Sequence, residues 1–425
     1  MSFALASASS MQRVFRDRPF DGPVGTPLEL SAAMNGWTSG QVVIMAGEKR
    51  LRNVRVDVKD LKSWEVSEDP VSESSHALVE GPPIPGAAFK VSKVHYVEIE
   101  WPSSGKTSRP GWYPDPLEPL TAESRFEVEP GMVQPIWLAL KVPPDTRARN
   151  KSLYRRWYRL FRGSVVVHAD VEGEGPQSVE IDIELRVFKF SLPRQRILRL
   201  WTMGGGGGWT EFYNWLSPEE VHEHVQRAVL LLASYGIASG LPEPPRAEGE
   251  PPDLDYFERF YKKVLDLGVS HLQIHQDTWP VIVKNGWEDI AYRYVAGEWP
   301  RETLIERAKD IRKNIATIPL VKGQAAGIYP SPYLEDLVKV WVYPSDESSD
   351  SLKERLAQGD EVHWYSCCRP EAPYANCQLD SGQIEPRILG WQLFQYNISG
   401  YLYWNAMHVA PHGPNQPNTM GDTPE

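Results

Sequence analysis

Short runs in which apolar and polar residues alternate fill most of the first 190 residues, with almost no helical periodicity between them. Such alternation is typical of strands with one buried face. The clearest runs read GQVVIMA, LRNVRVDVKDL, VHYVEIEW, QPIWLALKV, GSVVVHADV and SVEIDIELRVFKF. Clusters rich in proline and glycine separate them and predict turns or loops: EGPPIPG, RPGWYPDPLEP and EGEGPQS. The pattern predicts an antiparallel β-sandwich domain over residues 1–193, whose last strand ends at Pro193.

After Pro193 the pattern changes to alternating strands and helices, which places a second domain at residues 194–425. The predicted strands are 196–203, 235–241, 269–276, 290–296, 321–327, 338–344, 361–367 and 399–406. The predicted helices are 217–235, 254–268, 301–318 and 385–397. Ser217 starts the first helix as an N-cap that is followed by proline and acidic residues.

Eight strands with intervening helices predict a compact (β/α)8 barrel of the TIM type. Two connections, 277–289 and 328–337, are short for full helices, so the barrel is expected to be irregular. A doubly wound open sheet is the alternative, but no glycine-rich turn has the spacing of a dinucleotide site. The run GGGGG at 204–208 has no Lys-Ser or Lys-Thr after it and predicts a loop.

Composition narrows the choice of partners. The net charge is −11 with scattered basic residues, which argues against a nucleic-acid partner. No apolar run approaches the roughly 20 residues of a membrane span, so no membrane contact is expected. The start MSFALASASSMQRVF lacks the features of a signal peptide. We therefore expect a cytoplasmic protein as the chain stands, or a secreted or periplasmic one if a signal preceded it.

The cysteines and metal-binding residue types predict no cofactor. Cys367, Cys368 and Cys377 form neither a disulfide framework nor the paired spacing of a zinc site. One local bridge from Cys377 to Cys367 or Cys368 is an open alternative. No cluster of histidine, cysteine and aspartate has ligand spacing, so no metal is expected.

Aromatic and polar residues gather at the carboxyl ends of the predicted barrel strands, where barrel enzymes carry their chemistry. The chain has 16 Trp and 18 Tyr, and flat sugar rings stack on such side chains. Stacking in the core is the alternative explanation for the aromatic residues. The SDESSD stretch, with Asp346 and Glu347, fits a solvated loop better than a catalytic pair. The set of strand-end residues resembles a sugar pocket: Trp201, His275, Asp277, Glu298, Tyr329, Asp346, Glu347, Tyr365, Arg369, Trp404, Asn405 and His408.

Glu298 ends an apolar, aromatic strand and precedes Trp299-Pro300. A partly desolvated carboxylate has a raised pKa, which suits a general acid for glycoside cleavage. The competing interpretation is an acidic residue at a helix N-terminus, where it favours the helix dipole.

The stretch NGWEDIAYRYVAGEWPRETLIERAKDIRKNI resembles the segment around the catalytic pair of glycoside hydrolase family 123, the β-N-acetylgalactosaminidases. The stretch DEVHWYSCCRPEAPYANCQLDSGQIEPRILGWQLFQYNISGYLYWN resembles the end of the same catalytic domain. The AAMNGWTSGQVVI stretch resembles the opening strand of the family's sandwich. The resemblance covers most of the chain and is most specific at its C-terminal end.

The resemblance implies substrate-assisted retaining hydrolysis, in which the 2-acetamido oxygen of the sugar attacks C1. An aspartate holds the acetamido group, and the adjacent glutamate protonates the leaving oxygen. It further implies substrate-binding roles for Tyr365 and Trp404. The strand-end positions add five residues to the expected carbohydrate site: Trp201, His275, Tyr329, Arg369 and Asn405.

The family motif is Asp-Glu-Pro, and here the stretch reads Gly297-Glu298-Trp299-Pro300. The acid is Glu298, while glycine occupies the aspartate position. Asp277, expected at the end of the preceding strand, is the candidate for the second carboxylate, and a cap on the turn before Thr278 is its alternative role. The alternative functions are a glycosidase acting on a sugar without an acetamido group, a glycan-binding member without catalysis and a purely structural protein.

Overall fold

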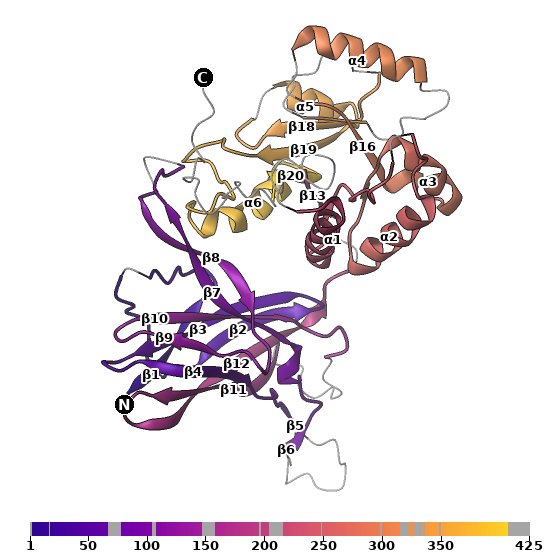
Figure 1. Ribbon diagram of the computed structural model, residues 1–425. Coiled ribbons are helices and arrows are strands. Elements are labelled where there is room, and N and C mark those ends of the chain that lie inside the picture. The colour runs from indigo at the N-terminus through magenta and orange to yellow at the C-terminus, as the bar shows by residue number, and fades with distance from the viewer. Residues whose placement is uncertain are drawn as a thin grey trace, which may run out of the picture. The chain divides into compact units, whose positions relative to one another are not determined.

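The chain divides into two compact units (Figure 1). Unit 1 comprises Met1–Pro102 and Arg109–Pro193, and unit 2 comprises Ser103–Ser108 and Arg194–Glu425. The computed structural model describes residues 2–16, 18–66, 78–103, 108–146, 158–194, 197–203, 216–247, 249–297, 300–314, 323–326, 334, 336–347 and 350–406.

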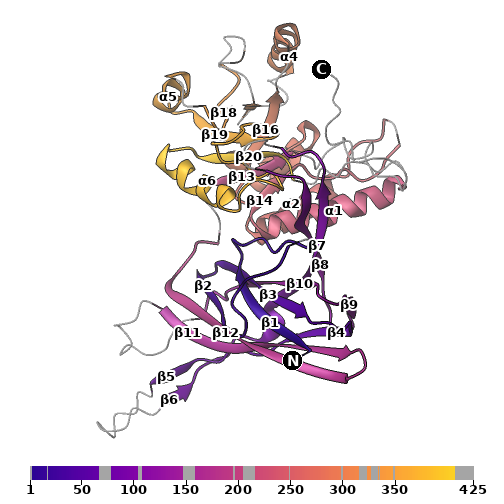
Figure 2. The same cartoon turned by 90° about the vertical axis from the view of Figure 1, so that its left-hand side faces the viewer.

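Unit 1 contains two five-stranded sheets and a two-stranded ribbon. In the order of the sheet, the first has β1 (Phe3–Ser9), β3 (Trp37–Ala46), β10 (Val133–Lys141), β7 (Phe89–Ile99) and β8 (Gly111–Pro119). The second has β2 (Leu28–Met34), β12 (Gly175–Ser191), β11 (Tyr158–Val171), β4 (Leu51–Val58) and β9 (Phe126–Val128). The ribbon pairs β5 (Trp64–Val66) with β6 (Leu78–Glu80), and Figure 2 shows it beside the long β11–β12 hairpin.

One hydrophobic core joins the inner faces of the two five-stranded sheets. Ile44 and Leu138 from the first sheet and Val167 and Ile183 from the second are fully buried in it. Alternate residues of β12 are buried, which is the period-two pattern visible in its sequence. Among the described strand pairs of unit 1, all are antiparallel except that between β2 and β12, which is parallel.

The segment RPGWYPDPLEP, predicted to be a turn or loop, instead contains β8. Its prolines lack the backbone N–H that a central strand needs on both sides. β8 lies at the edge of its sheet and, among the described strands, pairs only with β7. A proline N that faces the outer side of an edge strand therefore removes no hydrogen bond between strands. The rule that prolines mark turns or loops therefore gave the wrong prediction for this edge strand.

Unit 2 is built on one eight-stranded sheet. Its order is β14 (Ile237–Ser239), β13 (Arg199–Met203), β20 (Gly400–Asn405), β19 (Glu361–Ser366), β18 (Val340–Pro344), β17 (Gly323–Ala326), β16 (Ala291–Ala296) and β15 (Leu272–Gln273). Every neighbouring pair runs parallel. The helices among the described residues are α1 (Pro218–Ser234), α2 (Leu254–Leu267), α3 (Trp279–Asn285), α4 (Arg301–Asn314), α5 (Asp350–Ala357) and α6 (Ile384–Gln395).

The helix boundaries follow from local chemistry. Ser217 accepts a hydrogen bond from the Glu220 backbone N–H, and the Glu220 carboxylate accepts from the Ser217 backbone N–H, which forms a capping box. At the start of α2, the Asp253 side chain accepts a hydrogen bond from the N–H of Tyr256, and Gly268 ends α2 in the left-handed conformation. Figures 1 and 2 show α1 and α2 side by side.

The parallel sheet is strongly curved. β13 and β16 are five positions apart in its order, which would separate them by roughly 24 Å if the sheet were flat, given a spacing of about 4.8 Å per strand. Instead, the rings of Trp201 and Tyr294 are 6.2 Å apart between centroids, and Arg199 Nε donates to Tyr292 Oη at 3.2 Å. The inner face therefore encloses a layer of packed side chains.

The full (β/α)8 barrel predicted from the sequence is wrong. All eight predicted strands are present, but the described part of the chain holds only six α-helices, and the sheet forms a half-barrel. The end strands β14 and β15 meet only at one isolated bridge, between Gly240 and Gln273. β15 is two residues long, and the connection after it has room only for the seven-residue α3 between two 3-10 turns. A regular crossover helix with its loops needs more chain.

Candidate active site

The carboxyl ends of all eight parallel strands of unit 2 meet at one edge of the sheet, which we call the carboxyl edge. Ligands of parallel α/β sheets bind outside this edge, because the loops that follow the strands converge there. The residues that end the strands are Met203, Ser239, Gln273, Ala296, Ala326, Pro344, Ser366 and Asn405.

Two of the predicted aromatic residues form a row near the carboxyl edge. Trp201 in β13 is the register partner of Leu402 in β20, and Leu402 is the partner of Tyr365 in β19. Partners in a pleated sheet point to the same face. Trp201 is 3% exposed and Tyr365 is half-buried, so Trp201 forms the floor of the row.

An irregularity in β20 changes the direction of the last residues of the strand. Thr202 pairs with Tyr403, but Met203 pairs with Asn405, so Trp404 is an extra residue on β20. Bulges of this kind re-aim side chains and occur next to active sites. Met203 shares the face of Trp201, so its partner Asn405 returns to that face, while Trp404 is 38% exposed. The backbone N–H of Ala406 donates to Thr202 Oγ1 at 2.8 Å, which fixes the bulge.

A buried polar network lies beneath the row. Trp201 Nε1 donates to His363 Nδ1 at 3.1 Å, and His363 is fully buried. The His363 ring stacks on Tyr292, whose hydroxyl donates to Glu361 Oε2 at 2.7 Å. Burial raises the pKa of Tyr292, and the bond to Glu361 adds to the shift, so this phenol stays protonated. The network holds the floor of the site rigid.

His275 and Asp277 lie in the turn that follows β15, and both side chains are exposed. The turn is anchored by Thr278, which is fully buried and donates from Oγ1 to the His275 carbonyl at 2.8 Å. Tyr261 Oη lies 3.0 Å from the same Oγ1. Burial lowers the pKa of Arg293, and the charge of Asp277 acts in the opposite direction. Arg293 alternates along β16 with the inward-facing Tyr292 and Tyr294, so it lies on the other face of the strand. Attraction of Asp277 to the Arg293 charge therefore competes with a role for Asp277 at the inner face.

The loop after β19 carries Arg369 and the cysteines. The N–H of Cys367 donates to the Arg369 carbonyl at 2.8 Å, and Arg369 itself is exposed. Asn376, which is 2% exposed, donates to the carbonyls of Cys367 and Pro370 at 3.0 Å each. The loop is therefore braced from within at the carboxyl edge.

None of the three cysteines, all in the described part of the chain, is in a disulfide, so the local bridge left open by the sequence is not present. Cys377 Sγ lies 3.5 Å from Tyr401 Oη, and Tyr401 Oη is also bonded to Ser366 Oγ. Burial raises the pKa of the Cys377 thiol, and it raises that of Tyr401 well above the usual value.

The structure accounts for only part of the predicted site. The side chains of Trp201, Tyr365 and Asn405 share one face of the sheet at the carboxyl edge. Four other predicted residues lie at this edge with exposed side chains: His275, Asp277, Arg369 and Trp404. Asp346 is exposed and Glu347 is half-buried in the turn before α5. Gly297 is described and buried, directly after β16. Glu298, Tyr329 and His408 lie outside the described residues.

Sequence reasoning missed three buried polar side chains at the carboxyl edge. Ser239 Oγ, Gln273 Nε2 and Ser345 Oγ have no hydrogen-bond partner in the described part of the structure. These residues are 5%, 8% and 9% exposed, and each ends a strand or follows it directly. An unpaired buried polar group is costly, so such groups commonly mark the position of a water or ligand. The only sequence signal was a polar residue at the end of an apolar strand.

Within the residues that the structure describes, no group of three or more histidine, cysteine or acidic side chains could hold a metal ion. The described helices also include none that is long and apolar enough to cross a membrane.

Comparison with known proteins shows similarity to one class of enzyme, the glycoside hydrolases. Residues 258–417 match the family model described as Glycoside hydrolase 123, catalytic domain. The resemblance to glycoside hydrolase family 123 that the sequence predicted is therefore confirmed over residues 258–417.

A solved structure agrees with this assignment at the level of the fold. The chain is similar to a family 123 glycoside hydrolase from Clostridium perfringens, studied for glycolipid glycan hydrolysis, with 13% identity and a TM-score of 0.62. The similarity covers 95% of this chain and 78% of that one. No curated protein sequence matches the chain.

Two further similarities to solved structures are weak. A PapD-like domain of human CEP192 has 8% identity and a TM-score of 0.22, covering 43% of this chain and 99% of that one. Spo0M from Bacillus subtilis has 10% identity and a TM-score of 0.16, covering 45% and 51%. No conclusion follows from scores this low.

Proposed function

We propose that the protein hydrolyses terminal glycosidic bonds, with β-N-acetylgalactosaminides as the preferred substrates and Glu298 as the general acid. The observation that carries the proposal is the row of Trp201, Tyr365 and Asn405 on one face at the carboxyl edge. Tyr365 and Asn405 lie inside the segment that matches the family model. Aromatic faces with a few polar groups are what a pyranose ring requires.

Glu298 receives its role from its position in the sequence. It directly follows Gly297, at the carboxyl end of β16, and it lies inside the matched segment. As a general acid, Glu298 donates its proton to the glycosidic oxygen as the bond to C1 breaks. In the substrate-assisted route, the acetamido oxygen attacks C1 at the same time and forms an oxazolinium ion, which water then opens with Glu298 acting as base.

Gly297 cannot orient the acetamido group, since it has no side chain. We propose that Asp277 supplies the second carboxylate. The observation in favour is its position in the turn after β15, the strand that pairs with β16. Loss of one electrostatic contact to a developing charge costs roughly 10²–10³ in rate, so the source of this carboxylate decides how active the enzyme is.

Gly297 also favours a second candidate function, the binding of a glycan without cleavage. In that case, the aromatic row would hold a sugar at the carboxyl edge and Glu298 would have no catalytic role. A glycosidase for sugars without a 2-acetamido group is the third option, because such a substrate needs no group at the position of Gly297.

The deciding experiment compares aryl glycosides with and without a 2-acetamido group, using the wild-type chain, Glu298→Gln and the control Glu302→Gln. Glu302 is an exposed acid in the first turn of α4. We expect Glu298→Gln to lower hydrolysis of phenyl glycosides by roughly 10²–10⁴. Dinitrophenyl glycosides, whose leaving group needs no proton, should lose far less.

Each alternative has its own outcome. If the protein hydrolyses only substrates that lack the acetamido group, the third option is supported. Binding of a sugar without turnover in the wild type supports the second. Equal activity of Glu298→Gln and wild type on phenyl glycosides rules out Glu298 as the acid.

A further inference from the structure

Two adjacent thiols lie in the loop that follows β19, and the proposed reaction does not use them. Cys367 Sγ and Cys368 Sγ are 3.7 Å apart. Cys368 is exposed and Cys367 is half-buried, so a small molecule can reach the pair from solvent at Cys368. The two sulfur atoms therefore need to approach each other by only about 1.7 Å to reach the length of a disulfide bond.

Hydrogen bonds hold the backbone that carries the pair. The N–H of Cys367 donates to the Arg369 carbonyl at 2.8 Å, and Asn376 donates from Nδ2 to the Cys367 carbonyl at 3.0 Å. Asn376 is 2% exposed and donates also to the Pro370 carbonyl at 3.0 Å, so the turn is anchored from within. This turn keeps the two thiols near each other, which raises the effective concentration of one thiol at the other.

The third cysteine is a poorer partner for either thiol of the pair. Cys377 Sγ lies 3.5 Å from Tyr401 Oη, which is also bonded to Ser366 Oγ. Burial raises the pKa of the Cys377 thiol, so at neutral pH less of it is thiolate, the form that attacks a disulfide. Disulfide formation therefore favours Cys367 and Cys368 over a bridge to Cys377.

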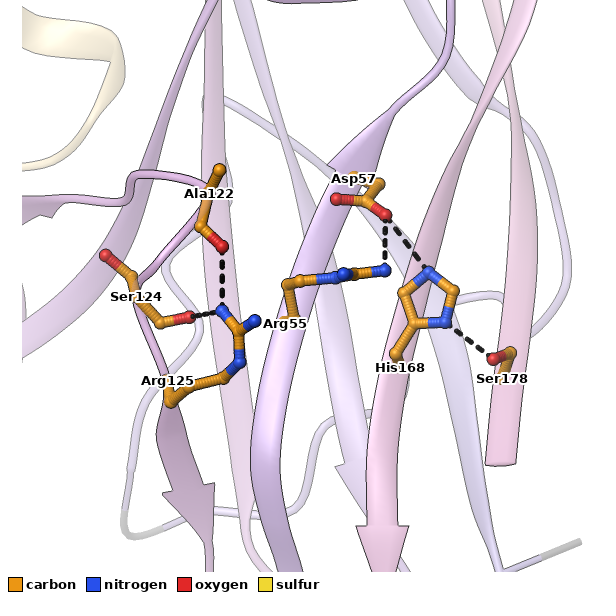
Figure 3. A network of polar contacts seen from close by, with 7 residues as sticks. All are labelled: Arg55, Asp57, Ala122, Ser124, Arg125, His168 and Ser178. Carbon is orange, nitrogen blue, oxygen red and sulfur yellow. Dashed lines mark hydrogen bonds and ion pairs between the residues drawn. The ribbon is translucent and has the colours of Figure 1, made fainter. Parts of the chain in front are cut away.

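Ser178 in unit 1 is another nucleophile with polar neighbours, but its network has a structural role. His168 lies 2.7 Å from Ser178 Oγ through Nδ1 and 3.1 Å from Asp57 Oδ2 through Nε2 (Figure 3). Arg55 donates to the same Asp57 oxygen at 2.9 Å, so the carboxylate is shared with a cation. The network joins the neighbouring strands β4, β11 and β12, and cross-strand contacts of this kind stabilise a sheet. The two thiols need no such neighbours, because exchange requires only a thiolate and a sulfur within its reach.

We propose that Cys367 and Cys368 are a redox modification site, at which a low-molecular-weight disulfide converts the two thiols into a reversible disulfide between adjacent residues. The Cys368 thiol loses its proton and attacks one sulfur of the small disulfide. The S–S bond of that molecule breaks, and its other sulfur leaves with the electron pair and takes up a proton. The Cys367 thiol then loses its proton and attacks Cys368 Sγ, which releases the second half of the small molecule as a thiol. The two protein thiols are oxidised by two electrons in total, and the small disulfide is reduced to two thiols.

The bond formed in this way is strained. The Cα atoms of adjacent residues are about 3.8 Å apart across a trans peptide, whereas roughly 4.4–6.8 Å is usual for a disulfide. A strained disulfide is more easily reduced and is typical of labile rather than structural bridges. The pair lies between Tyr365 and Arg369, so ring closure changes the backbone that joins these two residues of the candidate site. This consequence for sugar binding rests on the proposed function, whereas the modification itself does not.

The test treats the reduced full chain with mixtures of reduced and oxidised glutathione, and then unfolds it in urea with iodoacetamide to block the remaining thiols. Chymotrypsin cleaves after Tyr365 and Tyr374, so the pair and Cys377 fall in separate peptides for mass spectrometry. The variant is Cys367→Ser, which leaves the exposed thiol of Cys368 without its neighbour. The matched control is Cys377→Ser, and thermal melting confirms that both proteins are folded.

We expect oxidised glutathione to leave the wild-type pair peptide two hydrogens lighter and without alkylation, while the Cys377 peptide is alkylated. Excess reduced glutathione should restore both alkylations, because the bond is strained. In Cys367→Ser a glutathione adduct should accumulate to at least roughly ten times its level in the wild type, since no second thiol displaces it. The Cys377→Ser control should behave like the wild type.

Four results overturn the proposal. One is a bridge from Cys377 to either thiol of the pair, and another is a bridge between two chains. The third is a pair that stays alkylated, or that keeps a glutathione adduct, after treatment of the wild type with oxidised glutathione. The fourth is a disulfide that excess reduced glutathione does not reduce.

Discussion

The indole Nε1 of Trp201 reaches Nδ1 of His363 across an intervening strand. β20 lies between β13 and β19, and Gly400 is the β20 residue paired with His363. A side chain at Gly400 would occupy the space of the imidazole, because a Cβ placed there would lie 2.5 Å from His363 Cδ2 and Nε2. The glycine in the middle strand therefore makes the contact between Trp201 and His363 possible.

The first prediction concerns His363→Leu. This change keeps most of the buried volume but leaves the Trp201 indole N–H without its acceptor, in a position that is 3% exposed. An unsatisfied buried donor costs about 1–3 kcal/mol, so the free energy of unfolding should fall by that amount. Urea denaturation of the variant measures it.

The control is a double-mutant cycle with Trp201→Phe, which removes the N–H but keeps an aromatic ring. The double variant should lose less than the sum of the two single losses, because both changes remove one interaction. Additive losses would show that the hydrogen bond does not couple the two residues.

The second prediction compares two glycines of unit 2. Gly400→Ala should lower the free energy of unfolding by about 1–3 kcal/mol, since the added methyl group overpacks the His363 ring. Gly390→Ala is the matched control: it lies in α6, and an added Cβ there has no neighbour within 4 Å. Alanine favours a helix over glycine by up to about 1 kcal/mol, so the control should be neutral or stabilised. Equal effects in the two variants would contradict the packing described for Gly400.

Much of the architecture of unit 2 could be predicted because its signals are local. The run at 338–344 predicted β18, and the Ser-Pro-Glu-Glu sequence at 217–220 predicted the start of α1, where the structure shows the capping box. Periodicity and caps depend on residues only a few positions apart, so one sequence is enough to detect them.

Closure of the sheet could not be predicted in this way. Whether β14 and β15 join depends on contacts between strands, and the two share only the Gly240–Gln273 bridge. Alternation of strands and helices is the same for closed and partial barrels. The eight-residue α5 was missed as well, although Leu352 and Leu356 have helical spacing, because the preceding SDESSD stretch reads as a loop.

The sequence predicted where the candidate site lies, at the carboxyl ends of the strands, but it did not predict how the side chains are arranged there. Strand ends could be read from the sequence, so the positions of Tyr365 and Asn405 at the carboxyl edge were predicted. The bulge that re-aims Trp404 arises from a register shift against β13, and no local signal marks it. The buried polar ends of Ser239, Gln273 and Ser345 likewise depend on what packs around them.

The third prediction concerns the reactivity of two cysteines. Burial raises the pKa of the Cys377 thiol, so at neutral pH less of it is the reactive thiolate. Cys368 is exposed and serves as the internal control. We expect iodoacetamide to label Cys368 first, and labelling of Cys377 to increase only at pH values above about 8.5, the ordinary pKa of a thiol. Mass spectrometry of the labelled peptides measures both rates.

The Tyr401→Phe variant tests the direction of the pKa shift at Cys377. The hydrogen bond from Tyr401 lowers the pKa of Cys377, against the larger effect of burial. Its removal should raise the pKa further and slow labelling of Cys377 at a given pH. Equal labelling of Cys377 and Cys368 at neutral pH would show that the thiol is not shielded as the structure describes.

The last prediction decides the role of Asp277. If Asp277 supplies the carboxylate that Gly297 lacks, Asp277→Asn should lower hydrolysis of 2-acetamido aryl glycosides by roughly 10²-fold, since it removes a charge beside the developing oxazolinium ion. Activity on a substrate without the acetamido group should change much less. The matched control is Asp289→Asn, an exposed acid in the 3-10 turn at the opposite end of β16. The competing role, a charge partner for Arg293, predicts a change in stability with no loss of activity. Full activity of Asp277→Asn on a substrate that Glu298→Gln no longer cleaves would therefore exclude Asp277 from the reaction.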